Sequence, residues 1–192
     1  MTFIKKNEIR WTEALMARAI FQKFFGMRSV VVVPNCNWTG HECDLLCVDK
    51  SLRIVDVEIK ISRADFKADA KKEKWWSREV VGYDETNYGS DSRVRMMRTP
   101  VYESTAREWP PKVWKHYFAI PADVWDDSLL EFLPSENCGV ILVYGPNTAF
   151  VKKRAKANRD ATVISAEKAI DIARLANIRF WDMAAKVQAG AA

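Results

Sequence analysis

Cys43-Asp44-Leu45-Leu46-Cys47-Val48, followed by Arg53-Ile54-Val55-Asp56-Val57-Glu58-Ile59-Lys60-Ile61, is the stretch that decides the fold. Both segments have strand composition, and Asp49-Lys50-Ser51-Leu52 between them is typical of a hairpin turn. Along the second segment aliphatic residues alternate with a set that is mostly charged: Ile54, Asp56, Glu58 and Lys60. The pattern predicts an antiparallel hairpin with one apolar and one polar face.

The register of this hairpin brings two acids together. A turn centred on Ser51 places Asp44 directly opposite Glu58, with side chains about 5 Å apart, and Lys60 points the same way. Facing carboxylates repel each other unless a positive charge lies between them, and a divalent cation with oxygen ligands meets that need. The competing interpretation is that these charges form an ordinary solvated strand face.

Further elements follow on both sides of the hairpin. The apolar spacing predicts helices over 7–25, from Ser62 to about Trp76, and from Ser165 to about Val187. Four more strands are expected at 30–33, 116–120, 139–144 and 149–152. Residues 77–115 have no regular pattern and are interpreted as an irregular insertion with one short helix. Residues 1–192 are therefore expected to form a single α/β domain.

Composition narrows the class of protein. The chain has 192 residues, 48% of them hydrophobic and 29% charged, which excludes collagen-like and wholly disordered proteins. No apolar run is long enough to cross a bilayer, and no secretion signal is visible, so we expect a cytoplasmic protein without membrane partners. The net charge of +5 favours a polyanionic partner.

The residues Glu13, Asp44 and Glu58-Ile59-Lys60 resemble the PD-(D/E)xK nuclease superfamily, although Cys43 replaces the usual proline. Glu13 matches the acid on the first helix and stands at the head of that helix's apolar stripe. Within the superfamily, residues 40–75 and 116–180 resemble the MmcB-like DNA repair proteins of bacteria. The resemblance implies a restriction-endonuclease-like core, with a central mixed sheet of four to five strands flanked by helices.

The resemblance also implies an activity. It suggests hydrolysis of DNA phosphodiester bonds with Mg²⁺ or Mn²⁺, in DNA repair, recombination or phage DNA metabolism. Asp44, Glu58 and the carbonyl of Ile59 would bind one metal, and Glu13 would help bind a second or order water. Lys60 would orient or activate the attacking water and offset transition-state charge.

Basic residues suggest where DNA would bind. On a helix continuing past Ser62, one stripe carries Lys67, Lys71, Lys74 and Arg78, and such a stripe would follow a phosphate backbone. Arg93, Arg95 and Arg98, with Trp109 and Trp114 nearby, would clamp a strand or stack on bases. A solvated helix face explains the stripe equally well. Asp65, Asp69 and Lys72 are interpreted as a local ion-pair set.

Three function classes therefore stay open. A metal-dependent nuclease explains the acids best, and a DNA- or protein-binding module with weak or lost catalysis on the same fold is the alternative. A zinc-stabilised interaction protein is the third, because Cys36, His41, Cys43 and Cys47 lie within twelve residues. Their spacing is poor for zinc, and Cys43 and Cys47 are expected to be buried on the side opposite Asp44. The form of the DNA and the oligomeric state, including a homodimer, are left open.

Overall fold

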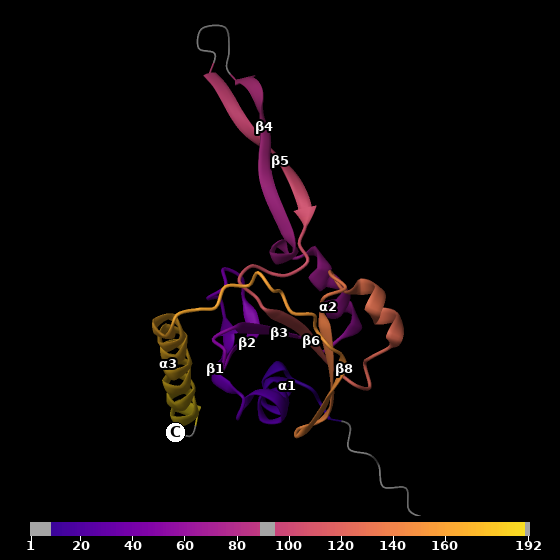
Figure 1. Cartoon of the computed structure of the whole chain (residues 1–192), viewed down its shortest axis with the longest axis vertical. Coiled ribbons are helices and arrows are strands. Elements are labelled where there is room, and N and C mark those ends of the chain that lie inside the picture. The colour runs from indigo at the N-terminus through magenta and orange to yellow at the C-terminus, as the bar shows by residue number, and fades with distance from the viewer. Residues whose placement is uncertain (1–8, 89–94, 191–192) are drawn as a thin grey trace, which may run out of the picture.

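A computed structural model describes residues 9–88 and 95–190 (Figure 1). Its helices are α1 (Glu13–Ile20), α2 (Arg63–Ala68) and α3 (Ala166–Gly190), with a π-helical turn η1 (Phe21–Phe25) after α1. Three 3-10 helices are η2 (Asp69–Lys71), η3 (Glu73–Trp75) and η4 (Asp127–Phe132). The strands are β1 (Ser29–Cys36), β2 (Cys43–Asp49), β3 (Ile54–Ile59), β4 (Trp76–Tyr88), β5 (Arg95–Ala106), β6 (Lys115–Pro121), β7 (Gly139–Gly145) and β8 (Thr148–Lys153).

The central sheet is mixed and has six strands in the order β1-β2-β3-β6-β7-β8. β3, β6 and β7 run parallel to one another, and the remaining neighbours pair antiparallel. The predicted α/β class is thus confirmed, but the expected four to five strands are too few. The helices of the described residues lack the combination of length and apolarity needed to cross a membrane.

The predicted β2–β3 hairpin has the expected register. Leu45 pairs with Val57 and Val48 with Ile54, which continues to Asp44 opposite Glu58. The turn is held by Asp49, whose Oδ1 accepts the N–H groups of Ser51 and Arg53 at 2.9 Å each. Such side-chain-to-backbone bonds are the reason Asp favours turns, and here they fix which residues share a face.

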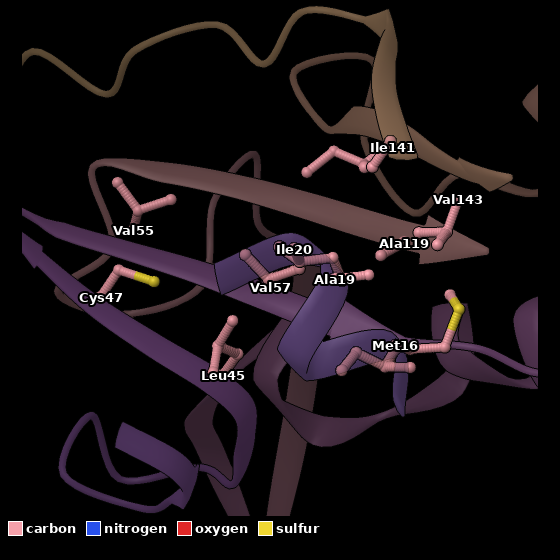
Figure 2. Packing of buried hydrophobic residues seen from close by; sticks show 12 residues of the cluster. Met16, Ala19, Ile20, Leu45, Cys47, Val55, Val57, Ala119, Ile141 and Val143 are labelled. Carbon is pink, nitrogen blue, oxygen red and sulfur yellow. The ribbon is translucent and has the colours of Figure 1, made fainter. Parts of the chain in front are cut away.

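One face of the sheet is covered by α1. Met16, Ala19 and Ile20 pack on a buried cluster that includes Leu45 and Val57 (Figure 2). The Thr12 Oγ1 caps this helix by accepting the N–H of Leu15 at 3.3 Å. The predicted helix over 7–25 thus begins later, at Glu13, and ends in a π-helical turn; residues 7 and 8 lie outside the described residues.

The opposite face is covered by two separate apolar clusters. Ile164, just before α3, and Ile172, within it, pack near β1 and β2, while Phe66 of α2 and Trp75 pack on β6 and β7. Glu58 and the other polar residues of β3 lie on this same face, because Val55 and Val57 belong to the α1 side. The alternation predicted for β3 therefore holds.

Three boundaries differ from the prediction. β1 continues through Pro34 to Cys36, which an edge strand allows because a missing N–H can face away from the ladder. Ser62 caps α2 as predicted, accepting the N–H of Asp65 at 3.2 Å, but the helix ends at Ala68 rather than near Trp76. α3 follows Ser165 as expected and runs to Gly190.

The stretch 77–115 is the largest correction. In place of an irregular insertion with one short helix, β4 and β5 form a long two-stranded ribbon that stands clear of the body (Figure 1). The cross-strand pairing runs from Trp76 opposite Ala106 to Tyr88 opposite Arg95. Neither face of the ribbon is buried in the core, so its strands contain Gly, Pro and charged residues and lack the apolar alternation that predicts a strand.

Candidate active site

A cluster of buried charges lies on β3 between the two apolar clusters of the α2 side. The side chains of Asp56, Glu58, Lys60, Asp69 and Lys74 are each no more than 3% exposed. A charge removed from water is costly unless it is paired, so the cluster must balance internally. Three carboxylates face three lysines here once the half-exposed Lys72 is included.

Glu58 is the hub of the cluster. Its Oε2 lies 3.0 Å from Nζ of Lys60 and 3.1 Å from Nζ of Lys72, and its Oε1 contacts Nζ of Lys74. Burial alone would raise the pKa of Glu58, but Lys74 and Lys60 outweigh it and hold that pKa well below the usual range. Glu58 is therefore a fixed, ionised carboxylate.

Asp69 ties the segment after α2 to β3. Its Oδ1 lies 2.9 Å from Nζ of Lys60 and 2.7 Å from Nζ of Lys72, and its Oδ2 accepts the indole N–H of Trp75 at 3.2 Å. The short η2 and η3 turns make this possible, because they fold Asp69, Lys72 and Lys74 back over Glu58. The predicted pairing of Asp69 with Lys72 exists, but it belongs to the site rather than to a local surface set.

Lys60 is held as an ammonium ion. Burial on its own would lower the pKa of Lys60, but the carboxylates of Glu58 and Asp69 raise it above its ordinary value. A lysine in this state donates hydrogen bonds and does not accept a proton. The role expected for Lys60 is thereby narrowed to orienting water and offsetting negative charge.

Asp44 lies beside Glu58, and no lysine in the described part of the chain forms an ion pair with it. Burial raises the pKa of Asp44 to about 7, the nearby Glu58 carboxylate adds to the rise, and the Ile59 N–H offsets part of it. That N–H donates to Oδ2 of Asp44 at 2.6 Å. Asp44 is therefore the acid of the site with the least positive charge around it.

The main chain of Ile59 adds a third oxygen. In an extended strand the N–H and C=O of one residue point to the same side. Because the N–H of Ile59 donates to Asp44, the carbonyl of Ile59 also points toward β2. Asp44, Glu58 and this carbonyl are the three groups that the sequence predicted as metal ligands, and all lie at the same end of the β2–β3 pair.

A buried histidine–aspartate pair next to the charged cluster was not predicted from the sequence. Nδ1 of His116 lies 2.9 Å from Oδ2 of Asp56, with both side chains almost completely buried. The ring of His116 packs edge-on against Trp75 and Phe118 at 4.9 and 4.8 Å between centroids. The parallel register of β3 and β6 places His116 opposite Asp56, and this pairing was not readable from the sequence.

Glu13 does not join the cluster in the way its sequence position suggested. Its side chain is exposed in the first turn of α1, so the expected carboxylate on the buried stripe is wrong. The apolar stripe of α1 begins with Met16 and faces the other side of the sheet from Glu58. Within 9–88 and 95–190, no ion pair or hydrogen bond connects Glu13 with Asp44, Glu58 or Lys60.

The predicted basic stripe is dispersed. α2 is too short to carry it: Lys67 and Lys71 are exposed, but Lys74 is 2% exposed and bound to Glu58. Arg78 and Arg98 lie on the ribbon and pair with Glu73 at 3.3 Å and Glu85 at 2.8 Å. Arg95 begins β5, and Arg93 lies outside the described residues.

The cysteines are buried free thiols distributed over three clusters, with Cys138 in the cluster of Phe66 and Trp75. Cys47 packs on the α1 side as predicted, whereas Cys36 and Cys43 lie in the α3 cluster, on the side of the charged site. The prediction that Cys43 is buried on the sheet face away from Asp44 is therefore wrong. In the part of the chain that the structure describes, no three His, Cys, Asp or Glu side chains come together as a metal-binding group.

Two pockets lie near the sheet. One of about 270 Å³ opens on the α1 side, lined by Phe24, Tyr117 and the predicted stacking residue Trp114, and no residue of the charged cluster lines it. A polar pocket of about 260 Å³ lies at the base of the ribbon, lined by His41, Glu73, Trp76, Arg78 and Arg107. Its residues Glu73 and Trp76 flank Lys74 and Trp75 along the chain, but no residue of the charged cluster lines it.

Asp44 should make stability depend on pH. Its pKa is raised in the fold, so its contribution is complete below pH 3.8 and is lost as the pH rises through about 7. We expect Asp44→Asn, unfolded by urea in EDTA, to exceed the wild type by about 1–2 kcal/mol at pH 8, allowing for solvent screening. The difference should grow from pH 4 to pH 7 and then level off. Exposed Glu42→Gln should show no such growth, and parallel curves for Asp44→Asn and wild type would contradict the prediction.

No family model and no curated protein matches the chain. Among solved structures, a protein of unknown function from Silicibacter pomeroyi is similar, with 15% identity and a TM-score of 0.48. The match covers 94% of this chain and 91% of that chain. A likeness at this level assigns neither a family nor a function.

Proposed function

We propose that the protein is a metal-dependent nuclease that hydrolyses DNA phosphodiester bonds. One observation carries the proposal: Asp44 and Glu58 lie side by side on one sheet face, with the Ile59 carbonyl directed to the same edge. Burial and the neighbouring Glu58 carboxylate raise the pKa of Asp44, so a bound cation would favour the ionised form of Asp44. The resemblance to PD-(D/E)xK nucleases concerns the same residues.

The donor set fits Mg²⁺ or Mn²⁺. Two carboxylates and a carbonyl are all-oxygen ligands, which hard divalent cations prefer. Glu58 already contacts three lysines, so a bound cation has to replace one of them. Lys72 is the one able to leave, because its side chain is 46% exposed while Lys60 and Lys74 are buried.

The protein's own residues then have separate tasks. Asp44 and Glu58 hold the cation, which when bound polarises the phosphate and lowers the pKa of water. Lys60, kept protonated by Glu58 and Asp69, donates its remaining hydrogen bond to the attacking water, and its charge offsets the negative charge that develops on the phosphate. Asp69 and Lys74 fix Lys60 and Glu58 in place.

A second function has an observation in its favour. The three lysines balance Glu58, Asp69 and Asp56 without any metal, so the fold is also suited to a DNA- or protein-binding module with weak or lost catalysis. Asp44 argues against that alternative, because a pure binding module gains nothing from a half-buried acid beside Glu58.

A cleavage panel separates the two functions. End-labelled single-stranded, duplex, nicked and branched DNA, with a matched RNA strand, is incubated with the protein in Mg²⁺, Mn²⁺ or EDTA. The nuclease proposal expects products in the metal lanes and none in EDTA. Binding to any of these substrates with no products in Mg²⁺ or Mn²⁺ would favour the binding module.

A further inference from the structure

The β4–β5 ribbon has two chemically different faces. Residues paired across antiparallel strands share a face, and the bulge between Val80 and Gly82 shifts the alternation by one residue. One face therefore gathers the aromatic side chains with arginines, and we call it the aromatic face: Trp76, Arg78, Val80, Tyr83, Arg98 and Tyr102. The other, the acidic face, carries Glu79, Asp84 and Glu103 with threonines.

The aromatic face is open to solvent. Trp76, Tyr83 and Tyr102 are 40%, 62% and 55% exposed, and beyond its base, where the Trp76 indole N–H donates to the Ala70 carbonyl, the ribbon projects from the body (Figure 1). A two-stranded ribbon in water is marginally stable alone, and aromatic side chains are normally buried unless they bind something. The exposed aromatic residues therefore indicate a ligand surface.

Charge is segregated between the two faces. By the strand register, the aromatic face has two arginines and one acid, whereas the acidic face has three acids and Arg95. The aromatic face also runs into the polar pocket at its base, where Arg107, His41 and Glu73 join Trp76 and Arg78. Arg78 pairs with Glu73 and Arg98 with Glu85, so the aromatic face is only slightly basic, but it disfavours a polyanion less than the acidic face does.

We propose that the aromatic face and its basal pocket bind single-stranded nucleic acid and lead it to the Asp44–Glu58 site. Aromatic side chains interleaved with arginine bind such strands, because unpaired bases stack on the rings while arginines contact phosphates. Glu73 and Trp76 of the pocket flank Lys74 and Trp75 along the chain, and Lys74 contacts Glu58, so the pocket lies next to the segment that folds over the site. The route to the site rests on the proposed nuclease function; the binding surface does not.

Two other occupants fit less well. A ribbon inserted into a duplex groove would set its acidic face against phosphates, which repel it. Pairing of two ribbons face to face buries little: about 40 Å of strand length and 10 Å of width give roughly 800 Å² in total. Stable interfaces bury about 1,200 Å² or more, so a second copy on this face alone is disfavoured.

The test measures binding of the full chain to fluorescent oligothymidylate by anisotropy in EDTA, where cleavage does not interfere. Tyr83→Ala/Tyr102→Ala should weaken binding about 5- to 100-fold, as expected for loss of base stacking. Thr99→Ala/Thr105→Ala, on the acidic face, is the matched control and should bind like the wild type. Arg78→Ser should reduce the salt dependence by about one phosphate contact.

Equal binding by the tyrosine variant and the wild type would overturn the proposal. So would a wild-type dimer in sedimentation that the tyrosine substitutions dissociate, because a second copy would then occupy the face. Wild type that binds oligothymidylate through the tyrosines but cleaves nothing supports the surface and contradicts the nuclease function. Wild type that cleaves DNA while the tyrosine variant binds normally contradicts only the inference.

Discussion

Lys60→Met should lower the rate of DNA cleavage about 10²- to 10⁴-fold, the usual cost of losing a positioned donor at the reacting centre. The ammonium group is held between Glu58 at 3.0 Å and Asp69 at 2.9 Å, and its raised pKa keeps it charged. Because Lys60 is not a metal ligand, Mn²⁺ affinity should stay within a few-fold of wild type. The measurements are single-turnover cleavage and Mn²⁺ titration of the same preparations.

The control for this variant preserves the buried charge. Lys60→Met leaves the cluster with an excess acid and so also weakens the fold, whereas Lys60→Arg retains the positive charge. We expect Lys60→Arg to fold like the wild type by circular dichroism and still cleave slowly, since a guanidinium has a different shape and donor geometry. Cleavage at the wild-type rate by both variants would contradict a role of Lys60 in catalysis.

Lys74→Met should be strongly destabilising. The ammonium group contacts Glu58, lies 4.0 Å from Asp56 and is 2% exposed. Removing one partner of a buried ion pair costs about 3–5 kcal/mol, because the other charge is left uncompensated. For a chain of this size that corresponds to a melting temperature lower by about 10 °C. Thermal unfolding followed by circular dichroism measures it.

Lys71→Met is the matched control, three residues earlier and exposed. Its melting temperature should change little, because exposed substitutions are usually within about 0.5 kcal/mol. Had Lys74 belonged to a solvated DNA-binding stripe, both variants would melt alike and both would weaken DNA binding. That pattern would contradict the buried cluster.

The hairpin was predictable because its information is local. Alternating residues around Asp49 and Ser51 specify both the register and the face, and the structure has the Asp44–Glu58 pairing that they implied. The cap at Ser62 was visible for the same reason. Such features depend on neighbours within a few residues along the chain.

The rest of the site depends on contacts distant in sequence. Lys72 and Lys74 were assigned to a helix, yet two 3-10 turns bring them onto Glu58, and helical spacing gives no sign of those turns. His116 meets Asp56 only through the parallel pairing of β3 with β6. The β4–β5 ribbon was not predicted, because neither of its faces is buried in the core and its strands therefore show no alternation of apolar and polar residues.

Binding of Mn²⁺ to the wild type and to Asp44→Asn, measured by isothermal calorimetry at pH 7.5 with Glu42→Gln as the exposed control, tests the central claim most directly. Removing a ligand should weaken binding at least as much as removing a supporting residue, by about tenfold or more. We expect wild type and Glu42→Gln to bind one Mn²⁺ alike and Asp44→Asn to bind far more weakly. Equal affinity for wild type and Asp44→Asn, or no binding by the wild type, would contradict a cation site between Asp44 and Glu58.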